Sequence, residues 1–199
     1  MGLPSGFYGI TDDRYGCVES ALKLLEFGAK IIQYRCKRLT DKEMFEQALK
    51  IRKLTREKGV LFIVDDRADI ALAVEADGVH VGDKDLPPCV IRKFAPEGFI
   101  IGLSTHSLED VKNAGCCDYI GVGPVFPTTT KEKPHKPLGV ELAREMVKAS
   151  RVPAYLIGGI TLENIDLISD IGAKGFVSVS DVLEHDREHF KEMLRRWNS

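Results

Sequence analysis

Three polar side chains alternate along one short apolar run of the sequence. Within residues 30–37 (KIIQYRCK), Gln33, Arg35 and Lys37 stand two positions apart. Side chains of an extended strand alternate between its two faces, so this spacing directs all three to the same side. Because burying an arginine and a lysine without a partner is costly, an anionic ligand is their natural partner. The structural alternative, which is compatible with a ligand-free site, is pairing with acids of the chain, namely Asp12, Asp66 or Asp85.

Carboxylates follow the next two apolar runs. Asp65 and Asp66 end residues 61–66 (LFIVDD), and Asp85 comes shortly after residues 77–81 (DGVHV). One or two carboxylates, together with substrate phosphates, are the usual ligands of Mg²⁺ in proteins. These acids and the basic run therefore fit a pyrophosphate bridged by Mg²⁺. An isomerase that acts on a monophosphate fits the same residues almost as well.

Two turns in the last third of the chain suit a phosphate group. Gly159 follows the run AYLIG, and Val179-Ser180 ends the run GFVSV. The backbone N–H groups of a turn that lacks bulky side chains can point at phosphate oxygens. A tight turn without a ligand is the alternative interpretation of the glycine pair at 158–159.

The loop at 124–138 carries hydroxyl groups and a lysine. It contains Thr128, Thr130 and Lys131 among four prolines. A connection of about 15 residues is longer than most plain connections between elements. We expect a flap that closes over an anion, and a plain surface loop is the alternative.

Short apolar runs alternate with helical patterns along the whole chain. We expect strands at 7–11, 30–35, 61–65, 77–81, 99–104, 118–123, 154–158 and 175–179. Apolar residues at intervals of three or four predict helices near 17–27, 41–58, 68–75, 87–94, 107–114, 139–150, 162–171 and 186–197. Thr40 and Ser107 are typical of helix starts. Glycines are expected to end four helices, at Gly28, Gly59, Gly115 and Gly172.

Strict strand–helix alternation predicts a parallel sheet covered by helices. Eight such units are the number that closes a barrel, so we predict an α/β fold, a compact single-domain (β/α)₈ TIM barrel over residues 1–199. An open doubly wound sheet is the alternative. Barrel enzymes carry their chemistry at the carboxyl ends of the strands, and there the polar residues above are joined by Ser104. His80 is expected to pack and hydrogen-bond inside the barrel.

Composition excludes several classes of protein. The 199 residues are 44% hydrophobic and 29% charged with a net charge of −2, which argues against a nucleic-acid-binding surface. No apolar run approaches the about 20 residues of a membrane span, and no signal peptide is evident. We expect a cytoplasmic protein without membrane partners, and a homo-oligomer remains one open outcome. Five cysteines without metal-ligand spacing predict reduced thiols.

Several motifs follow one another in order along nearly the whole chain. They are YGITD, the Gln33-x-Arg35-x-Lys37 run, FIVDDRADIALAVEADGVHVGDKDLP, IGLSTHSLEDV, DYIGVGPVFPTTTK, IGGITLENI and GAKGFVSVS. With these motifs the chain resembles the thiamine-phosphate synthase family and its relative, the thiazole tautomerase. The synthase joins an aminopyrimidine pyrophosphate to a thiazole phosphate, giving thiamine phosphate and pyrophosphate. So many motifs in order are specific for the superfamily and less decisive between its two branches.

The resemblance implies a role for each candidate residue. Gln33 would contact the aminopyrimidine, and Asp65 stands at a substrate-binding position. The pyrophosphate would be held by Arg35, Lys37, Ser104 and Lys131. Asp66 and Asp85 would ligate Mg²⁺. Thr128 and Thr130 would line the flap side. The thiazole phosphate would be held by Gly159, Val179 and Ser180.

One position departs from the synthase pattern. Where the family has Asn followed by Asp, this chain has Asp65-Asp66. An extra negative charge should weaken pyrophosphate binding unless Asp65 pairs with Arg67 or Lys37, or shares the metal.

A tautomerase would instead be expected to carry a proton-transferring histidine near Pro124, and the nearest in that loop is His135. A tautomerase-type homologue and a non-catalytic phosphate-binding barrel remain the alternatives.

Overall fold

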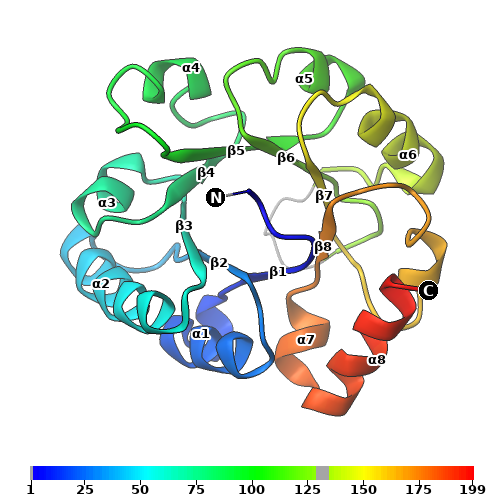
Figure 1. Ribbon diagram of the computed structural model, residues 1–199, viewed down its shortest axis with the longest axis horizontal. Helices are drawn as coiled ribbons and strands as arrows, with labels where there is room; N and C mark the ends of the chain where they lie inside the picture. The colour runs from blue at the N-terminus through cyan, green and yellow to red at the C-terminus, as the bar shows by residue number, and fades with distance from the viewer. Residues whose placement is uncertain (1, 129–134) are drawn as a thin grey trace.

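The protein is a closed parallel barrel ringed by helices (Figure 1), seen in a computed structural model that describes residues 2–128 and 135–199. Each strand pairs with its neighbour in sequence, and β8 pairs with β1. The strands are β1 (Gly6–Ile10), β2 (Ile31–Tyr34), β3 (Leu61–Asp65), β4 (Gly78–Val81), β5 (Ile100–Thr105), β6 (Tyr119–Val122), β7 (Ala154–Ile157) and β8 (Gly175–Val177). The predicted TIM barrel is confirmed, and all eight predicted strands are present.

The helices follow the strands in turn. They are α1 (Cys17–Glu26), α2 (Asp41–Lys58), α3 (Ala68–Ala73), α4 (Pro88–Ile91), α5 (Leu108–Lys112), α6 (Gly139–Ala149), α7 (Ser180–Glu184) and α8 (Arg187–Trp197). Thr40 and Glu43 form the predicted capping box of α2, and the left-handed Gly59 ends that helix. Gly28 also has a positive φ just after α1, whereas Gly115 does not, and Gly172 has a positive φ but ends no helix.

The expected helix at 162–171 is wrong. Only the short 3₁₀ turn η2 (Ile165–Leu167) forms there. The buried residues Ile165, Ile168 and Ile171 recur every three positions, a spacing that matches the period of a 3₁₀ turn. The Asn164 side chain donates to the Gly159 carbonyl and accepts from the Thr161 N–H, so it ties this backbone to the preceding loop. The one-turn helix α7 was not predicted.

Three tyrosines fill the inside of the barrel. Tyr8, Tyr119 and Tyr155 are each buried, and their ring centroids lie between 5.3 and 5.9 Å apart. This packing depends on a glycine in the adjacent strand, because a Cβ on Gly102 would lie 2.2 Å from the Tyr119 ring. The segment before β1 covers one end of the barrel, where the Tyr155 hydroxyl donates to the Pro4 carbonyl.

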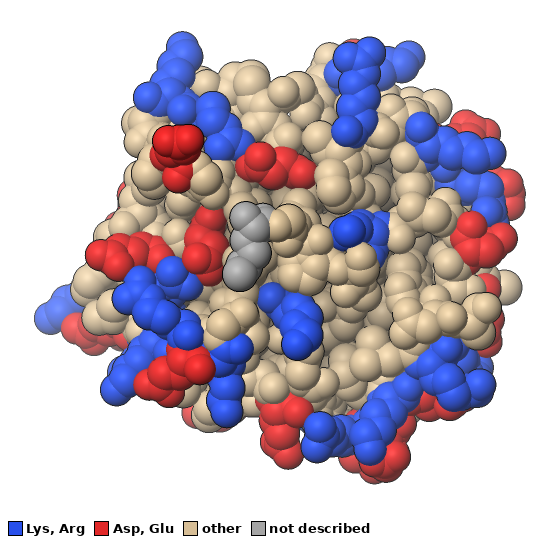
Figure 2. Space-filling view, viewed as in Figure 1, with Lys and Arg blue, Asp and Glu red and all other residues tan. Residues whose placement is uncertain are grey.

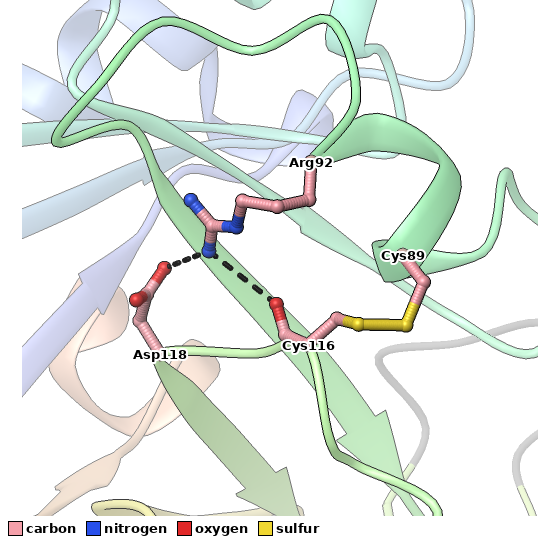
Figure 3. The surroundings of a disulfide bond; sticks show 4 residues. All are labelled: Cys89, Arg92, Cys116 and Asp118. Atoms are coloured by element: carbon pink, nitrogen blue, oxygen red, sulfur yellow. Dashed lines mark hydrogen bonds and ion pairs between the residues drawn. A yellow bond between two sulfur atoms is a disulfide. The ribbon is translucent and has the colours of Figure 1, made fainter.

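The expectation of reduced cysteines is wrong for one pair. Cys89 in α4 and Cys116 before β6 form a disulfide (Figure 3). Arg92 reinforces the same junction through the Asp118 carboxylate at 2.6 Å and the Cys116 carbonyl at 3.3 Å. The two cysteines are 27 positions apart, so only the packing of neighbouring units brings them together. Free thiols remain at Cys17, Cys36 and Cys117.

The surface carries charges of both signs. Figure 2 shows the barrel end crossed by the N-terminal segment, where basic and acidic side chains intersperse around the rim. Among the helices of residues 2–128 and 135–199, none combines the length and apolar character needed to cross a membrane.

Candidate active site

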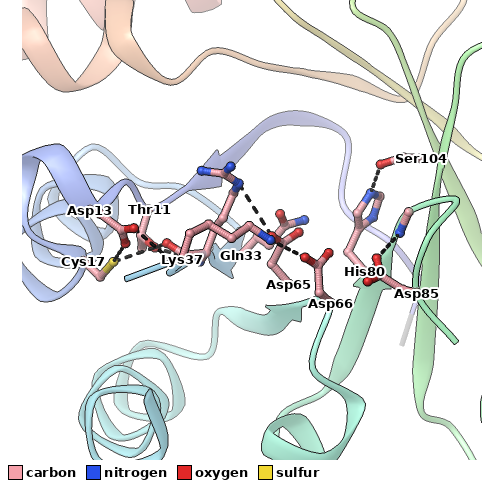
Figure 4. A network of polar contacts seen from close by, with 12 residues as sticks. Thr11, Asp13, Cys17, Gln33, Lys37, Asp65, Asp66, His80, Asp85 and Ser104 are labelled. Atoms are coloured by element: carbon pink, nitrogen blue, oxygen red, sulfur yellow. Dashed lines mark hydrogen bonds and ion pairs between the residues drawn. The ribbon is translucent and has the colours of Figure 1, made fainter. Parts of the chain in front are cut away.

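Charged side chains that follow β2 and β3 meet at the carboxyl end of the barrel (Figure 4). Lys37 Nζ lies 2.9 Å from Asp65 Oδ2 and also pairs with Asp66. Arg35 Nε lies 3.6 Å from the same Asp65 oxygen. Asp12, another expected partner, instead pairs with Arg14. Both cations therefore converge at the mouth, where acids of the chain hold them.

Asp65 and Asp66 both reach Lys37, although they are consecutive. The strand β3 ends at Asp65, and Asp66 adopts a left-handed conformation with φ of 61°. Its backbone N–H donates to the His80 carbonyl at 2.8 Å. The turn breaks the alternation that would otherwise direct the two side chains to opposite faces. A left-handed backbone costs a non-glycine residue about 1–2 kcal/mol, and such strain concentrates at functional sites.

Asp65 is the more buried of the two acids. Its side chain is 11% exposed against 32% for Asp66. Burial and the Asp66 charge raise the pKa of Asp65, against the opposing effect of Lys37. Burial also acts to raise the pKa of Asp66, but the hydrogen bond and charge of Lys37 outweigh it and lower that pKa. Of the two cations considered as partners of Asp65, Lys37 pairs with it. Arg67 instead pairs with Asp41 and Asp69.

The carboxylates of Asp66 and Asp85 face each other and interact directly. Burial raises the pKa of Asp85 against the hydrogen bond from the Gly82 N–H, and the Asp66 charge adds to the rise. Two facing carboxylates repel unless a proton or a cation lies between them. Their hard oxygen atoms are the ligand type that Mg²⁺ prefers. This pair therefore fits a divalent cation.

A continuous chain of hydrogen bonds crosses the barrel interior below these charges. Gln33 Nε2 donates to the Tyr8 hydroxyl at 2.9 Å, and that hydroxyl lies 2.7 Å from the Tyr119 hydroxyl. Tyr119 contacts His80 Nδ1 at 3.0 Å, and His80 Nε2 contacts Ser104 Oγ at 3.0 Å. This series of hydrogen bonds thus connects Gln33 of β2 with Ser104 of β5, two predicted substrate-binding residues. His80 packs and hydrogen-bonds as predicted.

One consistent order of donors runs from Gln33 to Ser104. Gln33 donates to Tyr8, Tyr8 to Tyr119, and Tyr119 to His80. Nε2 of His80 then donates to Ser104, whose own hydroxyl hydrogen remains for a ligand. Burial raises the pKa of both tyrosines, so they stay protonated. Tyr8 and Tyr119 are functional candidates that the sequence analysis missed.

We expect Tyr119→Phe to lower kcat/KM about tenfold, because loss of the central hydroxyl uncouples the orientations of Gln33 and Ser104. Tyr155→Phe is the matched control, since its hydroxyl is bonded only to Pro4 among the described contacts, at the opposite end of the barrel. Each variant should lose about 1–3 kcal/mol of stability. Steady-state kinetics and thermal unfolding measure both effects, and equal activity losses would contradict the positioning role.

The loop after β7 lies against the segment that follows β6, and the end of β8 lies against the loop after β7. Gly158 and Gly159 have φ of 100° and 64°. A Cβ on Gly159 would lie 2.3 Å from the Pro127 carbonyl oxygen, so only glycine fits this contact. Val179 immediately precedes α7, whose first residue is Ser180.

A cation missed by the sequence analysis lies beside the β8 loop. Arg14 Nη2 is 3.1 Å from Ser180 Oγ, and a two-bonded ion pair with Asp12 holds the guanidinium there. The sequence signal that could have identified Arg14 was its position directly after the first predicted strand, in the stretch TDDR.

The flap is only partly described. Thr128 is described and half-buried, whereas Thr130 and Lys131 lie outside the described residues. Just before this segment, His106 Nδ1 contacts the Gly123 carbonyl. The His135 ring stacks on the His106 ring, with centroids 3.7 Å apart. His106 and His135 are therefore the two candidates for the proton-transferring histidine that a tautomerase would carry near Pro124.

The fold and its charged mouth define a (β/α)₈-barrel enzyme. The chain belongs to the thiamine monophosphate synthase family, whose model matches residues 7–182. Members of this family are transferases of thiamine biosynthesis and use a metal cation.

Relatives named as thiamine-phosphate synthases align with nearly the whole chain. The thiamine-phosphate synthase of Pyrococcus horikoshii is 46% identical over 193 residues, which cover 95% of this chain and 92% of that protein. The synthase of Caldivirga maquilingensis is 42% identical over 207 aligned residues, covering 100% and 99%. The structure of thiamine phosphate pyrophosphorylase from Pyrococcus furiosus aligns with a TM-score of 0.87 at 39% identity, covering 96% of this chain and 95% of that one.

Proposed function

We propose that this protein is an Mg²⁺-dependent thiamine-phosphate synthase. It joins 4-amino-2-methyl-5-hydroxymethylpyrimidine pyrophosphate to a thiazole phosphate and releases pyrophosphate. The observation that carries the proposal is the convergence of Arg35 and Lys37 with the facing carboxylates of Asp66 and Asp85 at the barrel mouth. Family membership supports the same reaction.

The reaction begins with departure of the pyrophosphate. The bond between the pyrimidine methylene carbon and the pyrophosphate oxygen breaks, and its electron pair leaves with the pyrophosphate. The electron-rich aminopyrimidine stabilises the positive methylene, and Gln33 orients that ring. Arg35, Lys37 and Lys131 stabilise the negative charge of the leaving group, with Ser104 donating its hydroxyl hydrogen.

Bond formation then depends on the position of the thiazole. Its ring nitrogen donates an electron pair to the methylene carbon, and the new carbon–nitrogen bond gives thiamine phosphate. Gly159, Val179 and Ser180 hold the thiazole phosphate, with Thr128 and Thr130 on the flap side. Arg14 beside Ser180 adds a cation to this phosphate site. Holding both reactants in line supplies the proximity effect.

Asp66 and Asp85 would hold the Mg²⁺ ion. When bound, the ion supplies charge neutralisation to the pyrophosphate. Lys37 pairs with Asp65 and Asp66, so binding of the substrate would exchange these internal ion pairs for contacts with the pyrophosphate.

The deciding experiment mixes the protein with both substrates and MgCl₂ and measures thiamine phosphate by chromatography. We expect stoichiometric formation of thiamine phosphate and pyrophosphate, and loss of turnover on chelation of the metal. Absence of product under conditions in which a Pyrococcus horikoshii synthase control turns over would contradict the proposal.

A thiazole tautomerase is the second candidate. The stacked pair His106 and His135 beside Gly123 is the observation in its favour, because a tautomerase needs a proton-transferring group at that position. Conversion of one thiazole tautomer to the other, without synthase turnover and lost in His106→Ala or His135→Ala, would establish it instead. Ligand binding without either reaction would indicate a non-catalytic barrel.

We predict that Asp65→Asn lowers the KM for the pyrimidine pyrophosphate about fivefold. Asp65 now engages both Lys37 and Arg35, and removal of its charge frees these cations for the ligand. A single charge near the ligand is worth about 1 kcal/mol at partly screened distances. Asp69→Asn, which removes an acid paired with Arg67, is the control and should leave KM unchanged. An unchanged or raised KM in Asp65→Asn would mean that this acid assists binding.

The proposed partners are the two phosphorylated substrates, and the proposed location is the cytoplasm, where charged phosphorylated precursors are retained. Disulfides such as Cys89–Cys116 are rare in most cytoplasmic proteins but common in those of hyperthermophiles.

A further inference from the structure

A second cluster of metal-ligand side chains lies away from the Asp66–Asp85 pair, where α7 meets α8 (Figure 1). Asp181 belongs to α7, His185 follows the last residue of that helix, and His189 lies in the first turn of α8. One potential ligand atom from each residue lies within 4.8 Å of the other two. The spacing of four residues and the turn between the helices bring all three together.

The contacts inside this cluster are short and share one acid. His189 Nε2 lies 2.8 Å from Asp181 Oδ2, and His185 Nδ1 lies 3.8 Å from Asp181 Oδ1. His185 Nδ1 also lies 2.8 Å from the Asp181 carbonyl oxygen. Both imidazoles therefore direct an N–H toward Asp181. A metal ion would take the place of these two hydrogens.

The two imidazole rings of the cluster lie against each other. The two rings stack in parallel, with centroids 4.0 Å apart and planes 11° from each other. Neutral imidazole supplies the nitrogen lone pair that a metal ligand needs.

The carboxylate is anchored but lacks a permanently charged partner. The Leu162 N–H donates to Asp181 Oδ2 at 3.2 Å, which fixes the side chain against the loop after β7. In the described part of the chain, the ion pairs of Asp181 are with His185 and His189 alone. The cluster thus offers one carboxylate and two imidazoles to a cation.

We propose that Asp181, His185 and His189 bind one divalent transition-metal ion of the zinc class. Bonds of about 2.0–2.2 Å in tetrahedral geometry place ligand atoms about 3.3 Å apart. The two nitrogen–oxygen pairs of the cluster, at 2.8 and 3.8 Å, bracket that separation. Two imidazoles and one carboxylate favour Zn²⁺ over Mg²⁺, which prefers oxygen ligands.

The ion joins elements that are otherwise connected by a short turn. It links α7 to α8, and through Asp181 to the backbone at Leu162. This position is separate from Asp66 and Asp85, so the two sites are expected to differ in metal preference. The inference stands whether or not the protein is a synthase.

The test is calorimetric titration of the full-length, chelator-treated protein with ZnCl₂ in the presence of millimolar MgCl₂. We expect one Zn²⁺ ion per chain that Mg²⁺ does not displace, and a melting temperature that rises with zinc concentration. His185→Ala combined with His189→Ala should lose this ion, and Asp181→Asn should weaken its binding at least about tenfold. Circular dichroism without zinc checks the fold of each variant.

His135→Ala is the matched control, because it removes an exposed histidine from the other stacked pair of imidazoles. It should bind zinc like the parent. The proposal is wrong if the parent binds no zinc, or if the double variant keeps the bound ion, for example at Asp13, Cys17 and Cys36. Loss of the ion in His135→Ala, or displacement by MgCl₂, would contradict it equally.

Discussion

Asp85→Ala is expected to lower kcat by at least about 100-fold at saturating substrates and millimolar Mg²⁺. Its carboxylate faces Asp66, and loss of one of two acidic metal ligands removes several kcal/mol of charge stabilisation from the departing pyrophosphate. The fold should persist, because Asp85 lies in a loop and accepts one backbone hydrogen bond, from Gly82. Turnover as a function of MgCl₂ concentration measures the effect.

Two further variants distinguish loss of the metal ligand from disturbance of the loop that carries Asp85. Asp85→Asn keeps an oxygen that can accept from the Gly82 N–H but loses the charge, so it should be nearly as inactive as Asp85→Ala. Asp83→Ala removes an exposed acid two residues away and should retain parental kcat. Parental activity in Asp85→Ala, or an unchanged Mg²⁺ requirement, would mean that the metal is held elsewhere.

Removal of the Cys89–Cys116 disulfide is expected to produce the largest change in stability. The bond closes a segment of 27 residues that contains β5 and α5. Loop-closure entropy for that length corresponds to about 3.5 kcal/mol, or about 7–14 °C in melting temperature for a chain of this size. The double variant Cys89→Ser, Cys116→Ser should therefore unfold well below the parent in calorimetry.

Reduction provides an independent check on the same bond. Cys89 is exposed, so a thiol reductant should lower the melting temperature of the parent toward that of the double variant and leave the variant unchanged. Cys117→Ser removes the adjacent, buried free thiol and should keep the response to reductant. A parent that melts at the same temperature with and without reductant would show that the bond contributes nothing.

The Cys89–Cys116 disulfide could not be predicted from the pattern of the sequence. Because Cys116 and Cys117 are adjacent, the sequence does not show which of them would form a disulfide. Nor does spacing along the chain show which strand–helix unit packs closest to them. Their packing beside α4 selects Cys116 and leaves Cys117 buried as a thiol. The helix expected at 162–171 failed for a related reason. Its apolar spacing suits two helix types, and the Asn164 side chain, bonded to Gly159, favours the tighter one.

Local chemistry was enough to predict the barrel and most of its mouth. Short apolar runs, helix caps and strict strand–helix alternation are encoded by neighbouring residues, so the eight strands could be predicted without tertiary information. The spacing of Arg35 and Lys37 predicted that they converge, and they do so although both lie beyond Tyr34, the last residue of β2. Carboxyl ends of parallel strands share one face, which brought the acids to the same place.

Tertiary structure alone decided how these groups are joined. The reversal of the backbone at Asp66 sends two consecutive acids to one lysine, against the alternation of a regular strand. The chain of hydrogen bonds from Gln33 to Ser104 depends on tyrosines that sequence patterns assign simply to the core. Sequence periodicity specifies which face a side chain takes, whereas hydrogen-bond partners depend on distances between strands that only the closed barrel sets.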